Sequence, residues 1–188
     1  IKIAGNLKFY GEEKIKNKNE IKNKFKNFKA WCAASTHDGE EELIYKLHKN
    51  IKKTYKKLIT IIIPRHVNRT DEIIRNLKIN KLNFIKHSSN RIIKSNTDIY
   101  LVDVYGETSK FYDLTNVAFL GGSIIKHGGQ NPLEPARLGN YILSGPNINN
   151  FKEVYAFLNQ IKLSTSTSNE KTIEKLISSK INKKISGK

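Results

Sequence analysis

Short apolar runs alternate with amphipathic segments along most of the chain, and this alternation limits the possible folds more than any other feature. The apolar runs are continuous and rich in β-branched residues, which is typical of strands buried on both faces of a sheet. The predicted strands are residues 31–34, 58–63, 84–86, 99–102, 117–120 and 141–143.

The segments between these runs carry apolar residues at helical spacing, as Leu43, Ile44, Leu47 and Ile51 illustrate. The predicted helices are residues 40–56, 70–77, 107–114, 132–138, 151–161 and 172–185. Strands that alternate with helices indicate an α/β fold, with a Rossmann-like parallel sheet covered by helices on both faces. Ligands of such sheets bind at the carboxyl ends of the strands, so we expect the functional residues in the loops there.

Residues 14–29 are rich in Lys and Asn, have little apolar periodicity and are predicted to form an irregular connector. We therefore expect residues 1–29 to be an N-terminal segment and linker from another half of the protein. Residues 30–188 are predicted to be the Rossmann-like domain, with closing C-terminal helices. The chain begins with Ile1 and contains no Met, so we also expect further residues upstream.

The composition favours anionic partners, because 34 Lys and Arg against 17 Asp and Glu give a net charge of +17. Nucleic acid, phosphorylated small molecules and an acidic membrane surface all fit this charge, and a general abundance of Lys, Asn and Ile explains part of it. The longest apolar stretch, residues 58–64, is too short to span a bilayer. The single cysteine, Cys32, cannot form an internal disulfide, and its apolar surroundings predict a buried thiol rather than a nucleophile.

Polar residues follow the first predicted strand and lead into the first predicted helix. Ser35, Thr36 and His37 are candidates to contact a phosphate, because a helix start offers free backbone N–H groups and a positive dipole end. Asp38 and Glu41 are spaced as a capping box and are predicted to begin the helix. The carboxylates of residues 40–42 compete for the same dipole, so an anion bound there needs a cation nearby.

Two further strand ends carry candidate ligand contacts. Pro64 and Arg65 follow the second strand, and the guanidinium group of Arg65 offers a fork of donors suited to phosphate oxygens. Tyr105, Gly106 and Glu107 form another strand-to-helix turn, where glycine permits close approach of a ligand and tyrosine suits contact with a base. A plain loop explains this last turn equally well.

Residues 121–136 form the richest cluster, with glycine pairs at 121–122 and 128–129. Asn131, Pro132 and Glu134 are spaced as the cap and first turn of a helix. Capping does not explain the glycine pairs, which permit tight approach of a ligand to the backbone. Glu134 is also placed to accept hydrogen bonds from ribose hydroxyls, as acidic residues do in dinucleotide sites.

The sequence has no metal-ligand spacing of Cys and His, no Asp-x-Asp pair and no P-loop, so neither a metal nor another cofactor is expected. His48 is predicted to lie on the surface of a helix, and His87 is predicted to be isolated.

Taken in order, these clusters resemble motifs in the C-terminal half of the 3-deoxy-D-manno-octulosonic acid (Kdo) transferases. The matching runs are residues 5–9, 33–42, 63–66, 105–107, 119–136 and 146–152. The most specific of them is Gly-Gly-Gln-Asn-Pro-Leu-Glu-Pro-Ala at residues 128–136. The family often has His where Gln130 stands and usually has Met where Tyr105 stands.

The resemblance implies the C-terminal half of a two-domain GT-B glycosyltransferase that transfers Kdo from CMP-Kdo to a lipid A precursor in lipopolysaccharide biosynthesis. The implied partners are CMP-Kdo, the lipid A precursor and the anionic surface of the inner membrane. The N-terminal half is implied to hold the precursor, and the protein is implied to work at the cytoplasmic face of that membrane. Lys8 is implied to stabilise the transition state. The base lies in the N-terminal half, so we expect this chain alone to bind CMP weakly and to transfer nothing. The residues implied to contact CMP are Pro64, Arg65, Tyr105, Gly106, Glu107, Asn131, Pro132, Leu133 and Glu134. Ser35, Thr36 and His37 are the candidates to contact the phosphate or Kdo.

Two alternative functions stay open from the residues alone. The first is a basic, non-enzymatic module that binds nucleic acid, which only the charge supports. The chain lacks the interleaved surface aromatics on which single-strand binders stack bases, so no nucleic-acid partner is expected. The second is a transferase that uses another sugar nucleotide, such as a UDP-sugar, because one fold hosts many functions.

Overall fold

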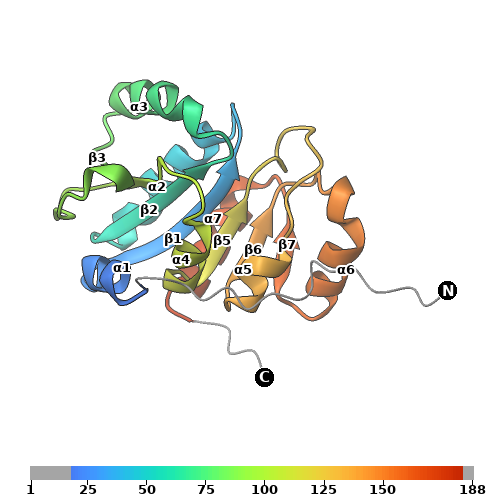
Figure 1. The fold of residues 1–188 in the computed structure, drawn as a ribbon. Helices are drawn as coiled ribbons and strands as arrows, with labels where there is room; N and C mark the ends of the chain where they lie inside the picture. The colour runs from blue at the N-terminus through green and yellow to red at the C-terminus, as the bar shows by residue number, and fades with distance from the viewer. Residues whose placement is uncertain (1–17, 184–188) are drawn as a thin grey trace.

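The computed structural model describes residues 18–183, so Lys8 and the other terminal residues lie outside the described part. A single sheet of 7 strands, all parallel, runs through the centre of the molecule (Figure 1). This confirms the predicted α/β fold. The strands are β1 (Lys29–Thr36), β2 (Leu58–Pro64), β3 (Phe84–Lys86), β4 (Ile99–Leu101), β5 (Val117–Leu120), β6 (Tyr141–Ser144) and β7 (Ser164–Ser166).

The strand order is β3-β4-β2-β1-β5-β6-β7, so the chain starts near the middle of the sheet. From β1 it proceeds to one edge through β2, β3 and β4, and it then returns to build the other half from β5. The direction of winding therefore reverses between β1 and β5. In open α/β sheets this reversal opens a crevice at the carboxyl ends of the two strands, where ligands bind.

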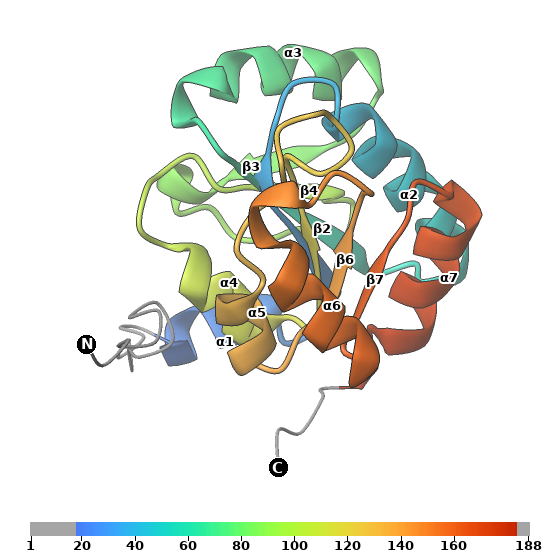
Figure 2. The same cartoon turned by 90° about the vertical axis from the view of Figure 1, so that its right-hand side faces the viewer.

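Helices cover both faces of the sheet, with α2 and α7 on one side and α1, α4 and α5 on the other (Figure 2). Short 3₁₀ turns, η2 (Val67–Arg69), η3 (His87–Ser89) and η4 (Asn149–Phe151), join some of the elements. The helices are α1 (Lys18–Phe25), α2 (Glu41–Thr54), α3 (Thr70–Ile79), α4 (Thr108–Leu114), α5 (Leu133–Arg137), α6 (Lys152–Gln160) and α7 (Glu170–Lys180).

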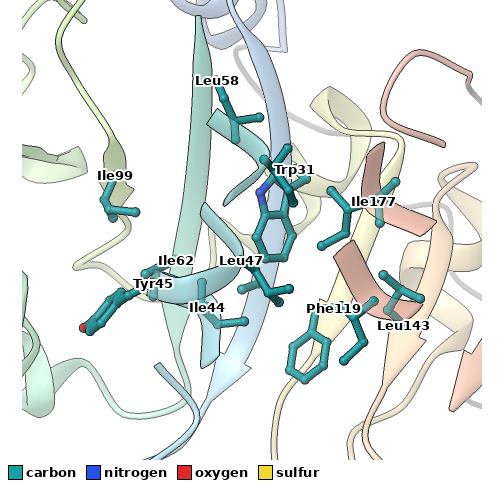
Figure 3. Close-up of a cluster of buried hydrophobic side chains, with 14 of the residues drawn as sticks. Trp31, Ile44, Tyr45, Leu47, Leu58, Ile62, Ile99, Phe119, Leu143 and Ile177 are labelled. Atoms are coloured by element: carbon teal, nitrogen blue, oxygen red, sulfur yellow. The ribbon is translucent and has the colours of Figure 1, made fainter. Parts of the chain in front are cut away.

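Alternate residues of the strands supply two separate hydrophobic cores, one under each layer of helices. In β1, Trp31 belongs to the core under α2, α3 and α7, whereas Cys32 belongs to the core under α1, α4 and α6. Figure 3 shows the first core, where Trp31 packs among residues that include Phe119 and Ile177. Because both faces of the central strands are buried, their sequences are continuously apolar, which is why they were readily predicted.

The prediction of an irregular connector over residues 14–29 is wrong for its described part, where α1 forms instead. Ile21 and Phe25 of this helix are buried in the second core, one helical turn apart. The short strand β7 was also missed, because its sequence, Ser-Thr-Ser, has no apolar residue. Between residues 18 and 183, no helix has the length and apolar character needed to cross a membrane.

Two histidines are also placed differently from the prediction. His48 is fully buried rather than exposed: its Nδ1 lies 2.9 Å from the Thr60 hydroxyl, and its Nε2 lies 3.3 Å from a carboxylate oxygen of Asp98. His87 is not isolated, because its Nδ1 lies 2.9 Å from the Tyr100 hydroxyl. Both side chains bind to neighbouring strands, which gives them a structural role.

The carboxylate of Glu40 joins the two halves of the sheet at the point where the winding reverses. Glu40 follows β1 and is fully buried. One carboxylate oxygen accepts hydrogen bonds from the backbone N–H groups of His37 (3.0 Å) and Gly122 (2.7 Å), and the other accepts from Ser123 (3.0 Å) and Ile124 (2.9 Å). Charge-assisted bonds of this kind are about twice as strong as neutral ones, so they offset the cost of burying the charge.

The loop after β5 comes so close to β1 that only glycine fits at position 121. A Cβ atom on Gly121 would lie 2.3 Å from the carbonyl oxygen of Ser35 and 2.7 Å from a carboxylate oxygen of Glu40. The first glycine of the pair at 121–122 is therefore required by the packing of the two loops.

We expect Glu40→Gln to lower the free energy of unfolding by about 2–5 kcal/mol, because the amide nitrogen would leave two buried N–H groups without an acceptor. The matched control is Glu42→Gln, an exposed residue in the first turn of the same helix. Urea unfolding followed by circular dichroism measures both variants. Equal midpoints for the two would contradict the role given to Glu40.

The Cys32 thiol is fully buried, and burial raises its pKa. We expect it to be inert towards a thiol reagent in the native protein and to react once the chain is unfolded in denaturant. Absorbance of the released chromophore measures the reaction. Rapid labelling under native conditions would show that the core around β1 opens.

Candidate ligand-binding site

The end of β1 carries a β-bulge that directs Ser35 into a surface hollow. The register of β1 against β2 shifts between Ala34 and Thr36, and Ser35 has a φ of 55°, in the left-handed region. Non-glycine residues adopt this conformation at a cost that the surrounding structure must support. The support here includes a hydrogen bond from the Arg65 N–H to the Thr36 carbonyl (2.9 Å). Bulges beside functional sites re-aim side chains in this way.

The predicted capping box of Asp38 and Glu41 does not form. Helix α2 begins at Glu41, the residue before it makes no side-chain cap, and Asp38 lies exposed outside the helix. The Glu41 carboxylate instead accepts hydrogen bonds from the Thr36 hydroxyl (2.8 Å) and from the Arg69 guanidinium (2.8 Å). Burial raises the pKa of Glu41, against the opposing effect of these two donors.

These bonds determine how the first predicted cluster can meet a ligand. The Thr36 hydroxyl points inward, to Glu41, so a ligand contact through it would require breaking that bond. Of the predicted phosphate contacts in this cluster, Ser35 lines the hollow. His37 lies deeper, 9% exposed, beside the loop that follows β5.

The hollow has a volume of about 370 Å³ and lies at the carboxyl ends of β1, β2 and β4. This size is suited to a small molecule. Besides Ser35, four of the residues predicted to contact CMP line it: Pro64, Arg65, Tyr105 and Gly106. The structure thus brings together residues from two loops that are about forty positions apart in the sequence.

Tyr105 covers the hollow from the outside. Its side chain is 72% exposed, and its hydroxyl accepts a hydrogen bond from the backbone N–H of Val67 (3.3 Å) on the opposite loop. The ring therefore spans from the β4 loop to the β2 loop, with a large apolar surface available for stacking.

Glu134 lies near this hollow, next to the start of α4. It is exposed at the start of α5, and its carboxylate accepts a hydrogen bond from the Ser109 hydroxyl of α4 (2.6 Å). Ser109 directly follows Thr108, which lines the hollow together with Arg65. Glu134 is thus hydrogen-bonded to the residue that follows a lining residue of the hollow, at the start of α4.

The remaining predicted contacts lie around these two residues. The Asn131 side chain accepts a hydrogen bond from the Leu133 N–H (3.0 Å), so it supports the first turn of α5, although the helix itself begins at Leu133. Pro132 is buried beside it. Glu107 pairs with Lys110 of α4 and lies 3.9 Å from His87.

Three histidines gather beside the hollow, and only His37 is among the predicted site residues. The rings of His37 and His127 lie 4.3 Å apart between centroids, and those of His37 and His66 lie 6.0 Å apart. Each follows a different central strand, so the signal in the sequence was a histidine repeated at successive strand ends. Within the described residues, no group of three His, Cys, Asp or Glu side chains is arranged to hold a metal ion.

A larger hollow of about 830 Å³ lies beside the edge strand β3, away from these residues. Its lining includes Lys78, Lys81, Arg91 and Lys94. It contains none of the predicted site residues and lies away from the point where the winding reverses.

No protein-family model matches the chain. Among curated proteins, it is 34% identical over 189 residues to the 3-deoxy-D-manno-octulosonic acid transferase of Haemophilus influenzae, and the match covers 96% of this chain and 44% of the relative. It is 32% identical over 181 residues to the enzyme of the same name from Rickettsia prowazekii, covering 95% of this chain and 39% of the relative. The chain therefore spans less than half the length of these relatives.

Among solved structures, the chain resembles the C-terminal CMP-Kdo binding domain of WaaA from Acinetobacter baumannii. The TM-score is 0.80 at 27% sequence identity, and the match covers 91% of this chain and 88% of that domain. Sequence and fold therefore agree on one assignment: the chain belongs to the 3-deoxy-D-manno-octulosonic acid transferase family and corresponds to its C-terminal domain.

Proposed function

We propose that this domain binds the CMP portion of CMP-Kdo at the hollow between the β2 and β4 loops. The observation that carries the proposal is that Pro64, Arg65, Tyr105 and Gly106, expected to contact CMP, line this one hollow. Glu134, expected to contact the same nucleotide, is hydrogen-bonded to Ser109 at its border. The structural relative is named as a CMP-Kdo binding domain, which supports the same ligand.

In the proposed complex, each side chain contacts the part of CMP that suits its chemistry. The Arg65 guanidinium binds the phosphate, to which it can offer two parallel donors. The Tyr105 ring packs against the base, and Glu134 exchanges its bond to Ser109 for the ribose hydroxyls. Asn131, whose side-chain oxygen accepts from Leu133, has its amide N–H groups to donate to the phosphate. Ser35 also lines this hollow.

We further propose that the nucleotide is held for transfer of Kdo to a lipid A precursor. In that reaction the bond between the anomeric carbon and the phosphate oxygen breaks, and an acceptor hydroxyl bonds to the same carbon and loses its proton to a base. Negative charge develops on the departing CMP, and Lys8, Arg65 and Asn131 would stabilise it. Removal of one such donor typically lowers the rate on the order of a hundredfold.

The acceptor suggests where the protein works. A lipid A precursor is a membrane lipid, so we propose that the domain acts at the cytoplasmic face of the bacterial inner membrane. The net charge of +17 supports this, because each Lys or Arg near an anionic surface contributes about 1 kcal/mol.

We expect Arg65→Met to weaken the binding of CMP by roughly 10- to 100-fold, because it removes hydrogen bonds to a charged phosphate. Isothermal titration calorimetry of the 188-residue chain measures the affinity. The matched control is Arg91→Met, which removes an exposed arginine far from this hollow and should leave the affinity unchanged.

The choice of nucleotide tests the proposal against other functions. Binding of UMP as tight as that of CMP would indicate a different sugar nucleotide. Binding of a single-stranded oligonucleotide that weakens steeply with salt, without any binding of CMP, would instead indicate a nucleic-acid module.

We expect Glu134→Ala to abolish the preference for CMP over 2′-deoxy-CMP, because the carboxylate accepts a hydrogen bond from the 2′-hydroxyl in the proposed complex. The unchanged protein should prefer CMP by about tenfold, the effect of one hydrogen bond to a charged group. The control is Glu153→Ala, in the first turn of α6, which should keep the preference. If Glu134→Ala weakens the two ligands equally, the ribose contact is wrong.

A further inference from the structure

His37 has a buried nitrogen without a hydrogen-bond partner. The side chain is 9% exposed, and its Nε2 atom finds no partner among the described residues. Buried polar atoms are nearly always hydrogen-bonded, so an exception in a loop at the edge of a sheet suggests that a ligand completes it. The proposed function does not use this atom.

The Nε2 atom faces a small space above Gly122. A Cβ atom added to Gly122 would lie 3.3 Å from Nε2 of His37, 3.1 Å from Cδ2 of His127 and 3.4 Å from Nε2 of Gln130. The glycine leaves this space open between three side chains that can donate hydrogen bonds. It lies at the point where the winding of the sheet reverses, next to the proposed nucleotide site.

Two further imidazoles lie beside His37. His127 and His66 are exposed, their rings lie 4.3 Å and 6.0 Å from that of His37 between centroids, and Arg65 directly precedes His66. Burial lowers the pKa of His37, and His127 lowers it further, while Glu40 acts in the opposite direction. The Glu40 carboxylate already accepts four backbone hydrogen bonds, so it leaves the imidazole nitrogens to another acceptor.

We propose that His37, His66 and His127 form a subsite that binds the carboxylate of the acidic sugar in the donor. This inference rests on the proposed function and adds to it the group that recognises the sugar. In a CMP-linked 2-ulosonic acid, the carboxylate and the phosphate ester are attached to the same carbon. A site that binds the phosphate through Arg65 must therefore receive the carboxylate within a few ångströms, where the histidines lie.

The subsite selects for the sugar by its charge. A nucleotide that carries a neutral sugar has no anion to place above Gly122, and it would leave the His37 nitrogen buried without a partner. Loss of such a bond is costly, which is how a polar site rejects a ligand that lacks the matching group.

The test compares CMP-Kdo with CMP by calorimetry, in the unchanged chain and in His127→Asn, His66→Asn and His37→Asn. Because a substitution at the buried His37 can prevent folding, the variants at the two exposed positions, 66 and 127, test the subsite independently. We expect the unchanged chain to bind CMP-Kdo about tenfold more tightly than CMP, the gain from charge-assisted hydrogen bonds, and each variant to lose most of this ratio. Lys126→Asn removes a neighbouring exposed positive charge and should keep the ratio.

The ratio should also rise as the pH falls from about 8 to about 6, because a bound carboxylate favours protonated imidazoles. In the free chain, burial lowers the pKa of His37, so its imidazole takes up a proton together with the bound carboxylate; the titratable and charged groups around it are Glu40, Arg65, His66 and His127. The variants should show a flatter profile. A ratio near one in the unchanged chain, or an unaltered ratio in all three variants, would overturn the proposal.

A second measurement separates this inference from the proposed function. The imidazole proton signals of the chain are followed by NMR during addition of free Kdo and, separately, of its methyl ester. We expect the acid to shift the signals of His37, His66 and His127 and the ester to leave them in place. If CMP fails to bind but the acid shifts these signals, only the nucleotide site is wrong; if CMP binds and the acid has no effect, the carboxylate subsite is wrong.

Discussion

The buried carboxylate of Glu40 is the interaction on which the arrangement of this edge depends. A parallel sheet that winds outward from its middle in two directions leaves the loops after β1 and β5 side by side, without a strand pairing to fix them. Glu40 provides that connection, since four backbone N–H groups from both loops converge on its two oxygens. Because a charge buried this deeply is tolerated only with such complete hydrogen bonding, the two loops have little freedom to separate.

This interaction also decides which donors remain for a ligand. A glycine-rich loop after a strand often binds phosphate through its own backbone N–H groups. Here the N–H groups of Gly122, Ser123 and Ile124 are already bonded to Glu40, so these three are not available to bind a phosphate. In the proposed complex, recognition of an anion at this edge therefore falls to side chains. The imidazoles of His37, His66 and His127, which lie close together, and the neighbouring Arg65 are the side chains available for it.

The layers of the fold follow from the sequence because continuous apolar runs such as Leu58–Pro64 have no stable place outside a sheet covered on both sides. For the site, the sequence predicts contacts at Arg65, Tyr105 and Glu134, and the structure brings Arg65 and Tyr105 together in the lining of one hollow. The partners of Glu40 and Glu41 are distant in the sequence: the Gly122 N–H donates to Glu40, and the Arg69 guanidinium donates to Glu41. Local spacing does not show these partners, so it suggested a capping box instead. Helix α1 was missed for a related reason: its two buried residues, Ile21 and Phe25, stand among lysines and asparagines that give no periodic signal.

The two glycine pairs, which helix capping left unexplained, have separate structural causes. In the first pair, Gly121 allows contact with β1 and Gly122 leaves room beside His37. In the second pair, a Cβ atom on Gly128 would lie 2.4 Å from the Asn150 side chain. The backbone N–H of Asn150 donates a hydrogen bond to the Gly128 carbonyl (3.0 Å). The Asn150 amide also donates to the His127 carbonyl (3.3 Å). The second pair therefore fixes the backbone that carries His127, so the same glycines that pack the loop place an imidazole over His37.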